Sequence, residues 1–104
     1  MTIQINTDKT INSDHKMQEY FTSQIEGTLK RYESLISRIE VYVKDENGSK
    51  DGINDVSCIL EARLNGRQPI AITSQAGTLE LALASGMSKI ESALESILGR
   101  IQHH

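Results

Sequence analysis

Apolar residues follow a helical spacing in two long segments of the sequence and a strand spacing in the segments between them. Residues 14–36 and 78–101 repeat apolar side chains every three or four positions. The alternating segments, typical of strands with one buried face, are residues 2–6, 39–43, 56–64 and 70–72. The apolar stripe of each helix and the apolar face of each strand have to be buried against another element. The pattern therefore predicts an α+β two-layer sandwich of order β-α-β-β-β-α, with both helices on one face of a four-stranded sheet.

The two helices are expected to differ in how they begin. The first should begin near Asn12, Ser13 and Asp14, whose side chains can accept from free backbone N–H groups, and should run to Ile36. Gly27 inside it costs about 1 kcal/mol relative to alanine, so it marks either a close approach to the sheet or a tolerated weak point. The second helix should begin near Thr78. Its apolar stripe comprises Leu79, Leu83, Met87, Ile90, Leu94, Ile97 and Ile101.

The strands carry further local signals. Residues 56–64 form the longest alternating run and are expected at the centre of the sheet, with Cys58 on the buried face. Asn65-Gly66 is a strong hairpin signal, because both residue types tolerate positive φ, so the flanking strands should be antiparallel neighbours. Pro69 favours the beginning of a strand or a sheet edge. Residues 45–52 contain two glycines and almost no apolar side chain, which predicts a mobile loop.

Composition restricts the classes of function. One cysteine among 104 residues cannot form an internal disulfide, no Cys/His spacing resembles a zinc site, and the chain has room for one domain with one core. No signal-peptide pattern is present, and no stretch approaches the roughly 18 apolar residues that span a bilayer. A cytoplasmic protein without metal or membrane is expected. The net charge of −3 opposes nonspecific attraction to nucleic acid, so any such role needs a local basic patch.

The sequence argues against an enzyme. It contains no phosphate-binding glycine loop and no clustered set of nucleophile, base and carboxylate at motif spacing. His15 stands alone near the expected helix start, where a surface or capping role is the simpler interpretation. Cys58 has the strand phase of an inert core thiol. The carboxylate pairs Asp45/Glu46 and Asp51/Asp55 flank the expected loop and are read as solvated charge. We therefore expect neither catalysis nor a cofactor.

One exposed apolar position is expected on the open sheet face. Tyr42 alternates with the buried residues of its strand and should point into solvent, with Ile59 nearby. Such a pair offers a small surface for a protein partner. Few other aromatic side chains are available for stacking on single-stranded nucleic acid, because the remaining ones lie on or near the first helix.

The order of elements and several local segments resemble the hibernation-promoting factor family, also known as ribosome-associated inhibitors or sigma-factor modulation proteins. The segments are Ile3-Gln4-Ile5-Asn6, residues 29–39 running into Val41-Tyr42-Val43, Leu64-Asn65-Gly66, and Ile72-Thr73-Ser74-Gln75-Ala76-Gly77. The resemblance covers nearly the whole chain and is to the short form, without a C-terminal dimerisation domain. It implies a stress factor that binds the small ribosomal subunit and its RNA, inhibits translation and catalyses no reaction.

The resemblance also implies which residues contact ribosomal RNA. Family members present basic residues from both helices, and Lys30, Arg31 and Lys89 are the candidates for phosphate contacts here. Thr28, Ser92 and Ser96 occupy positions that are often basic in the family. The alternative for the three candidates is ordinary solvated helix charge. Both helical segments are net negative, with acidic residues Asp14, Glu19, Glu26 and Glu33 in the first and Glu80, Glu91 and Glu95 in the second.

Two functions remain open from the sequence. The first is ribosome binding with inhibition of translation. The alternative is a protein of the same fold that no longer binds RNA and instead binds a protein through its acidic surface or open sheet face. The arrangement of charge separates them: a single patch of Lys16, Lys30, Arg31 and Lys89 favours the ribosome, and evenly alternating charge favours a protein partner. The loop residues Lys50 and Arg67 could add contacts to RNA, but the sequence does not define their position.

Overall fold

A computed structural model describes residues 1–7, 15–45 and 56–102 of the chain. Its elements are β1 (Thr2–Thr7), α1 (His15–Leu29), a 3-10 turn η1 (Lys30–Tyr32), β2 (Ile36–Asp45), β3 (Val56–Leu64), β4 (Ile70–Ala76) and α2 (Leu79–Gln102). The predicted element order is confirmed. The expected capping residues of the first helix, and all of the expected mobile loop except Asp45, lie outside the described residues.

The four strands form one mixed sheet in the order β1-β2-β3-β4. β1 is parallel to β2, with Ile3 opposite Ile39, because α1 carries the chain back across the sheet between them. The β2/β3 and β3/β4 pairs are antiparallel. β3 is interior, as predicted, but β2 is also interior and at ten residues is one residue longer than β3.

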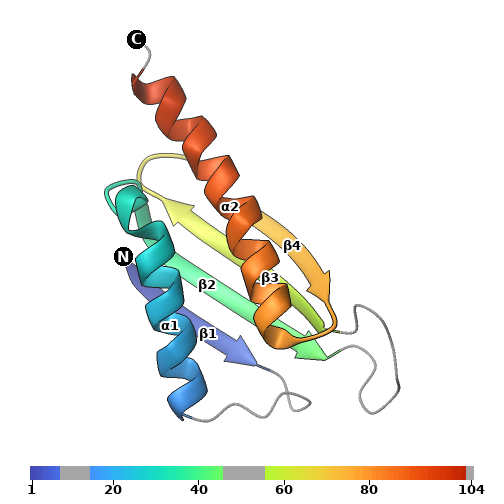
Figure 1. The fold of residues 1–104 in the computed structure, drawn as a ribbon. Helices are drawn as coiled ribbons and strands as arrows, with labels where there is room; N and C mark the ends of the chain where they lie inside the picture. Colours follow the sequence, from blue (N-terminus) through green and yellow to red (C-terminus); the bar gives the residue numbers. More distant parts are fainter. Residues whose placement is uncertain (8–14, 46–55, 103–104) are drawn as a thin grey trace.

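Both helices cover the same face of this sheet, and the opposite face is open (Figure 1). The predicted two-layer α+β sandwich is confirmed. The strand phases explain this arrangement: Ile39, Val41 and Val43 of β2 are buried, whereas Tyr42 between them is exposed.

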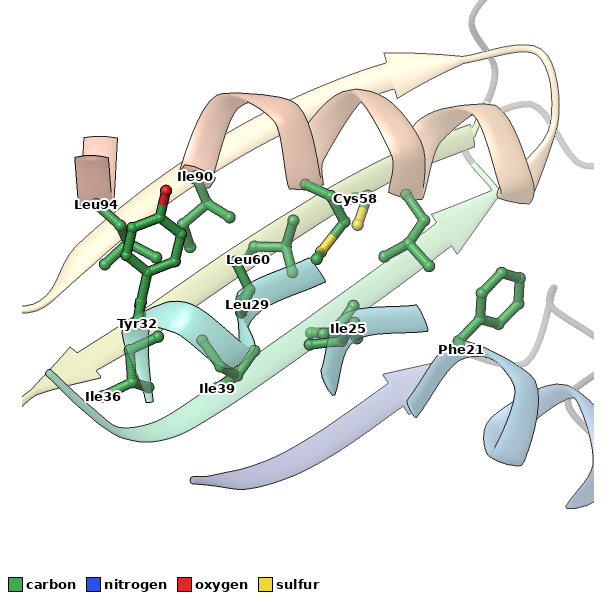
Figure 2. Close-up of a cluster of buried hydrophobic side chains, with 14 of the residues drawn as sticks. Phe21, Ile25, Leu29, Tyr32, Ile36, Ile39, Cys58, Leu60, Ile90 and Leu94 are labelled. Atoms are coloured by element: carbon green, nitrogen blue, oxygen red, sulfur yellow. The ribbon is translucent and has the colours of Figure 1, made fainter. Parts of the chain in front are cut away.

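The core lies between the helices and the covered face of the sheet (Figure 2). Ile25 and Leu29 of α1, Leu60 of β3, and Ile90 and Leu94 of α2 have no exposed surface. Each helix therefore buries its predicted stripe against the strands, the main source of stability in a fold of this kind. Cys58 is fully buried in this core, which confirms its predicted phase, and burial raises the pKa of its thiol to about 11.

The prediction that the first helix continues to Ile36 is wrong. α1 ends at Leu29, one 3-10 turn follows, and Ile36 is already the first residue of β2, paired with Leu64. The backbone N–H of Leu35 donates to the carbonyl of Tyr32, and that of Asn65 donates to the carbonyl of Leu35. Ile36 is buried at the start of β2 and also fits the spacing of the helical stripe, so its apolar character could not distinguish helix from strand.

Gly27 is exposed, and a Cβ at this position would have no neighbour within 4 Å, so it is a tolerated weak point and not a close approach to the sheet. The close approach occurs at Gly86 of α2. There a Cβ would lie 2.5 Å from Cδ1 of Leu60 and 3.1 Å from Oγ of Ser74. Gly86 therefore lets α2 pack closely over β3 and β4.

The turns agree with their sequence signals. Gly66 has φ of 70°, the left-handed conformation that favours glycine, in the connection between β3 and β4. Pro69 comes directly before β4, which is an edge strand. Thr78 caps α2, since its Oγ1 accepts from the backbone N–H of Leu81 at 3.2 Å.

Candidate nucleic-acid interface

Lys30 and Arg31 lie on the 3-10 turn that follows α1. Both side chains are exposed, whereas the next residue, Tyr32, is only 1% exposed and anchors the turn in the core. The backbone N–H of Glu33 donates to the carbonyl of Lys30 at 3.1 Å and closes the turn. Lys30 has no ion-pair partner within the described part of the chain, so its ammonium group is available to an anion.

Arg31 is held by an acidic side chain of the other helix. Its Nη2 lies 3.1 Å from Oε2 of Glu95, and its guanidinium carbon lies 5.1 Å from the centre of the Tyr32 ring. The hydroxyl of Tyr32 donates to the same carboxylate oxygen at 2.6 Å. Burial, assisted by this hydrogen bond, raises the pKa of Tyr32 to about 12. We call these three residues the Glu95 cluster; it joins the end of α1 to α2, and a phosphate would have to compete with Glu95 for Arg31.

Lys89 lies on a different side of α2. It is exposed, and its Nζ donates to the carbonyl of Thr73 on edge strand β4 at 2.9 Å. Glu95, which meets α1, is six residues further along, which places it well around the helix from Lys89. The structure therefore does not bring Lys89 together with Arg31 in one patch.

Lys89 instead lies in line with a basic residue that was not among the predicted RNA contacts. Arg100 follows it by eleven residues, about three helical turns, so the two share one stripe of α2. Ser92 and Ser96 lie between them on the same stripe, and all four side chains are exposed. We call this row the outer stripe of α2.

The outer stripe ends at a second arginine from a distant part of the chain. Arg67, in the connection between β3 and β4, lines a hollow of about 730 Å³ together with Arg100 and with Gly66, Gln68 and Ile97. Both arginines are exposed, and neither has an ion-pair partner among the residues that the structure describes. The sequence left the position of Arg67 undefined. The signal for Arg100 was its helical spacing from Lys89.

The surface between the two helices is acidic. Glu80 and Glu91 of α2 line a groove of about 480 Å³ against α1, to which α1 contributes Tyr20 and Thr28. Thr28, which occupies a position often basic in the resembled family, therefore lines the same groove as these carboxylates. Positive charge lies outside the groove and negative charge within it.

The open sheet face carries charges that are mostly paired with one another. Arg38 pairs with Glu40 at 2.8 Å, and Arg63 pairs with Glu61 at 3.1 Å. The hydroxyl of Tyr42 donates to Glu40 at 2.6 Å, which lowers the pKa of that carboxyl together with Arg38 and raises the pKa of Tyr42. Tyr42 and its cross-strand neighbour Ile59 are 43% and 41% exposed, as the strand phases predicted.

Three other observations bear on the expectations from sequence. His15 is exposed at the start of α1 and lies 2.9 Å from Glu19, which agrees with its predicted surface role. Within residues 1–7, 15–45 and 56–102, no group of three or more histidine, cysteine or acidic side chains is placed to hold a metal ion. No helix in these ranges is both long and apolar enough to cross a membrane.

Known structures share this fold. The N-terminal domain of Protein Y from Thermus thermophilus matches it with a TM-score of 0.74 and 11% sequence identity, over 93% of this chain and 99% of that one. A ribosomal subunit interface protein from Coxiella burnetii matches with a TM-score of 0.69 and 16% identity, over 95% of this chain and 99% of that one. No protein-family model and no curated protein matches the sequence. Both structures are of the family that the sequence resembles, so the resemblance is confirmed at the level of the fold.

Proposed function

We propose that this protein associates with ribosomes, where it binds the small subunit and inhibits translation without catalysing a reaction. The observation that carries the proposal is the fold, which is shared along nearly the whole chain with a protein described as a ribosomal subunit interface protein. Such a protein inhibits by occupying a site on the ribosome. This requires a surface that recognises RNA and does not require an active site. The proposal implies a cytoplasmic protein.

The RNA contacts are proposed to come from charges that lie outside the acidic groove. Lys89 and Arg100 begin and end the outer stripe of α2, and Arg67 extends it into the neighbouring connection. Lys30 adds a free ammonium at the end of α1, and Arg31 contributes when a phosphate displaces Glu95. Arginine suits this task because its guanidinium can donate two parallel hydrogen bonds to a phosphate.

Sedimentation with purified small subunits tests the proposal, and sedimentation with ribosomes from starved and growing cells tests the physiological setting. Replacing Lys30, Arg31 or Lys89 by alanine should weaken binding by about 1 to 2 kcal/mol, and each change should make the salt dependence shallower by about one contact. Arg67→Ala and Arg100→Ala should act in the same way. Arg63→Ala is the matched control, because this arginine is paired with Glu61 on the open sheet face.

Gain of binding provides the sharper experiment. Ser92→Arg and Ser96→Arg add charge to exposed positions in line with Lys89, so each should strengthen binding and raise the salt at which the complex dissociates. The parent should bind weakly and lose binding at low salt, since both helices are net negative. If the arginine variants bind no better and the alanine variants bind like the parent, RNA recognition by these helices is refuted.

Inhibition requires a separate measurement. Adding the protein to a cell-free translation reaction should lower product formation in proportion to small-subunit occupancy, and the alanine variants should inhibit less. If the protein binds the small subunit but does not change translation, ribosome association is supported and inhibition is refuted.

A further inference from the structure

The groove between α1 and α2 has an apolar end that packing within the chain does not cover. The helices run side by side in the same direction over the sheet (Figure 1). Near their beginnings, Tyr20 of α1 and Leu81 of α2 line the groove and remain 54% and 60% exposed. The Tyr20 ring meets the ring of Phe21 edge-on, with 5.3 Å between ring centres, which supports its position. Neither Tyr20 nor Leu81 belongs to the buried stripe of its helix.

Two carboxylates accompany these apolar side chains. Glu80 is exposed beside Leu81, Glu91 is half-buried further along the groove, and neither has an ion-pair partner in the described part of the chain. They are eleven residues apart, about 16 Å along the helix axis at the usual rise of 1.5 Å per residue. On the open sheet face, by contrast, Glu40 and Glu61 are neutralised by neighbouring arginines. The groove therefore combines exposed apolar surface with uncompensated negative charge.

We propose that this groove binds a basic amphipathic helix of another protein. An apolar side chain of that helix packs between Tyr20 and Leu81, and its lysine or arginine residues pair with Glu80 and Glu91. Charge complementarity selects this occupant: the carboxylates repel the phosphates of RNA, the headgroups of anionic membranes and a second copy of this chain, whose net charge is −3. An amphipathic helix in an apolar groove is an established mode of peptide recognition.

The groove is lined by none of the residues proposed to contact RNA. Lys89 lies on the other side of α2, against β4, and Arg100 lines a hollow with Arg67. Lys30 and Arg31 follow the end of α1, where Arg31 pairs with Glu95. The inference therefore does not depend on ribosome association, and each can fail without the other.

The test uses a fluorescent synthetic peptide of about 15 residues, long enough to span both carboxylates as a helix, with leucine on one face and lysine on the other. The full chain should bind it saturably at moderate salt, and a peptide with glutamate in place of every lysine should not bind. A labelled single-stranded RNA of mixed sequence is the third ligand tested, after the basic peptide and the acidic peptide. In the amide NMR spectrum, the basic peptide should shift signals of residues 20–28 and 80–91.

Charge reversal defines the site. The double variant Glu80→Lys/Glu91→Lys should bind the basic peptide at least about tenfold more weakly, because two attractions become repulsions. The control Glu26→Lys/Glu33→Lys changes net charge equally at exposed positions that do not line the groove, and should change affinity less than about twofold. Leu81→Ser tests the apolar end. It should weaken binding several-fold without loss of the helical circular dichroism signal, since Leu81 is mostly exposed.

Three results would overturn the inference. One is equal weakening by the groove and control variants, which would indicate diffuse electrostatic attraction. Another is unchanged peptide affinity in Leu81→Ser. The third is RNA that shifts the groove signals in the parent chain, which would assign this surface to nucleic acid.

Discussion

Replacing Glu95 by glutamine isolates the charge that joins the end of α1 to α2. The substitution keeps the size of the side chain and an oxygen that can accept from the Tyr32 hydroxyl, but removes the negative charge opposite Arg31. A hydrogen bond to a charged acceptor contributes about 1.5 to 3 kcal/mol and one to a neutral acceptor about 0.5 to 1.5 kcal/mol, so the Tyr32 bond should lose about 1 kcal/mol.

Loss of the ion pair between Arg31 and Glu95 lowers the stability by less, because the two side chains are 61% and 50% exposed and water screens their charges. Exposed pairs contribute about 0.2 to 1 kcal/mol. The Glu95→Gln variant should therefore unfold with a free energy about 1 to 2 kcal/mol below that of the parent. The pKa of Tyr32 should fall from about 12 but stay above its ordinary value of 10, because burial, the larger cause, remains. The loss of charge also frees Arg31, so small-subunit binding should strengthen even though the fold is weaker.

Urea unfolding, absorbance titration of the tyrosines and subunit sedimentation measure the three effects. Glu26→Gln makes the same charge change at an exposed site of α1 and should change stability by less than about 0.5 kcal/mol. When Tyr32 is already replaced by phenylalanine, Glu95→Gln should change the stability much less, because the hydroxyl that donates to Glu95 is absent. Equal stabilities of the parent and Glu95→Gln, or an unchanged Tyr32 titration, would refute the role assigned to the Glu95 cluster.

Three further outcomes test the packing. Gly86→Ala should lower the free energy of unfolding, measured in urea, by about 1 to 2 kcal/mol, because the added Cβ meets buried Leu60. Gly27→Ala should raise the free energy of unfolding by about 0.5 to 1 kcal/mol, because nothing lies within 4 Å of the added Cβ. A stabilising Gly86→Ala would show that α2 can move off the sheet. Cys58 should react slowly with thiol reagents in the native protein and quickly after unfolding, and fast native labelling would contradict its register. Folding raises the pKa of Cys58 from 9 to about 11, so the stability that the neutral thiol contributes is complete below pH 9 and is lost as the pH rises to 11. Folding raises the pKa of Tyr32 from 10 to about 12, so its contribution is complete below pH 10 and is lost as the pH rises to 12. Unfolding free energies of the parent should therefore fall more steeply above pH 9 than those of Cys58→Ala/Tyr32→Phe, and parallel curves would contradict the shifts.

The layer arrangement could be predicted from the sequence because the period of apolar residues is a local property. Alternation in β2 and β3 placed Cys58 inside and Tyr42 outside, and helical spacing placed Leu94 against the sheet, as the structure shows. The Asn65-Gly66 turn was predictable for the same reason, since positive φ is a property of the residue itself.

The end of α1 depended on tertiary pairing. Ile36 fits both the helical stripe and the strand, and its pairing with Leu64, twenty-eight positions further along, decides between them. The role of each glycine was likewise undetermined, because the backbone conformation of Gly27 and Gly86 is helical in both cases and only the approach of β3 and β4 distinguishes them.

The charge pattern shows the limit of sequence most clearly. The sequence established that basic residues are few and that both helices are net negative, because these are counts. Only the folded chain decided that Arg31 meets Glu95, sixty-four positions away, and that Arg67 and Arg100 line one hollow. An ion pair forms only where the two charged groups come within about 4 Å of each other in space, whatever their separation along the chain, so the partner of each charge is set by how the helices and strands pack.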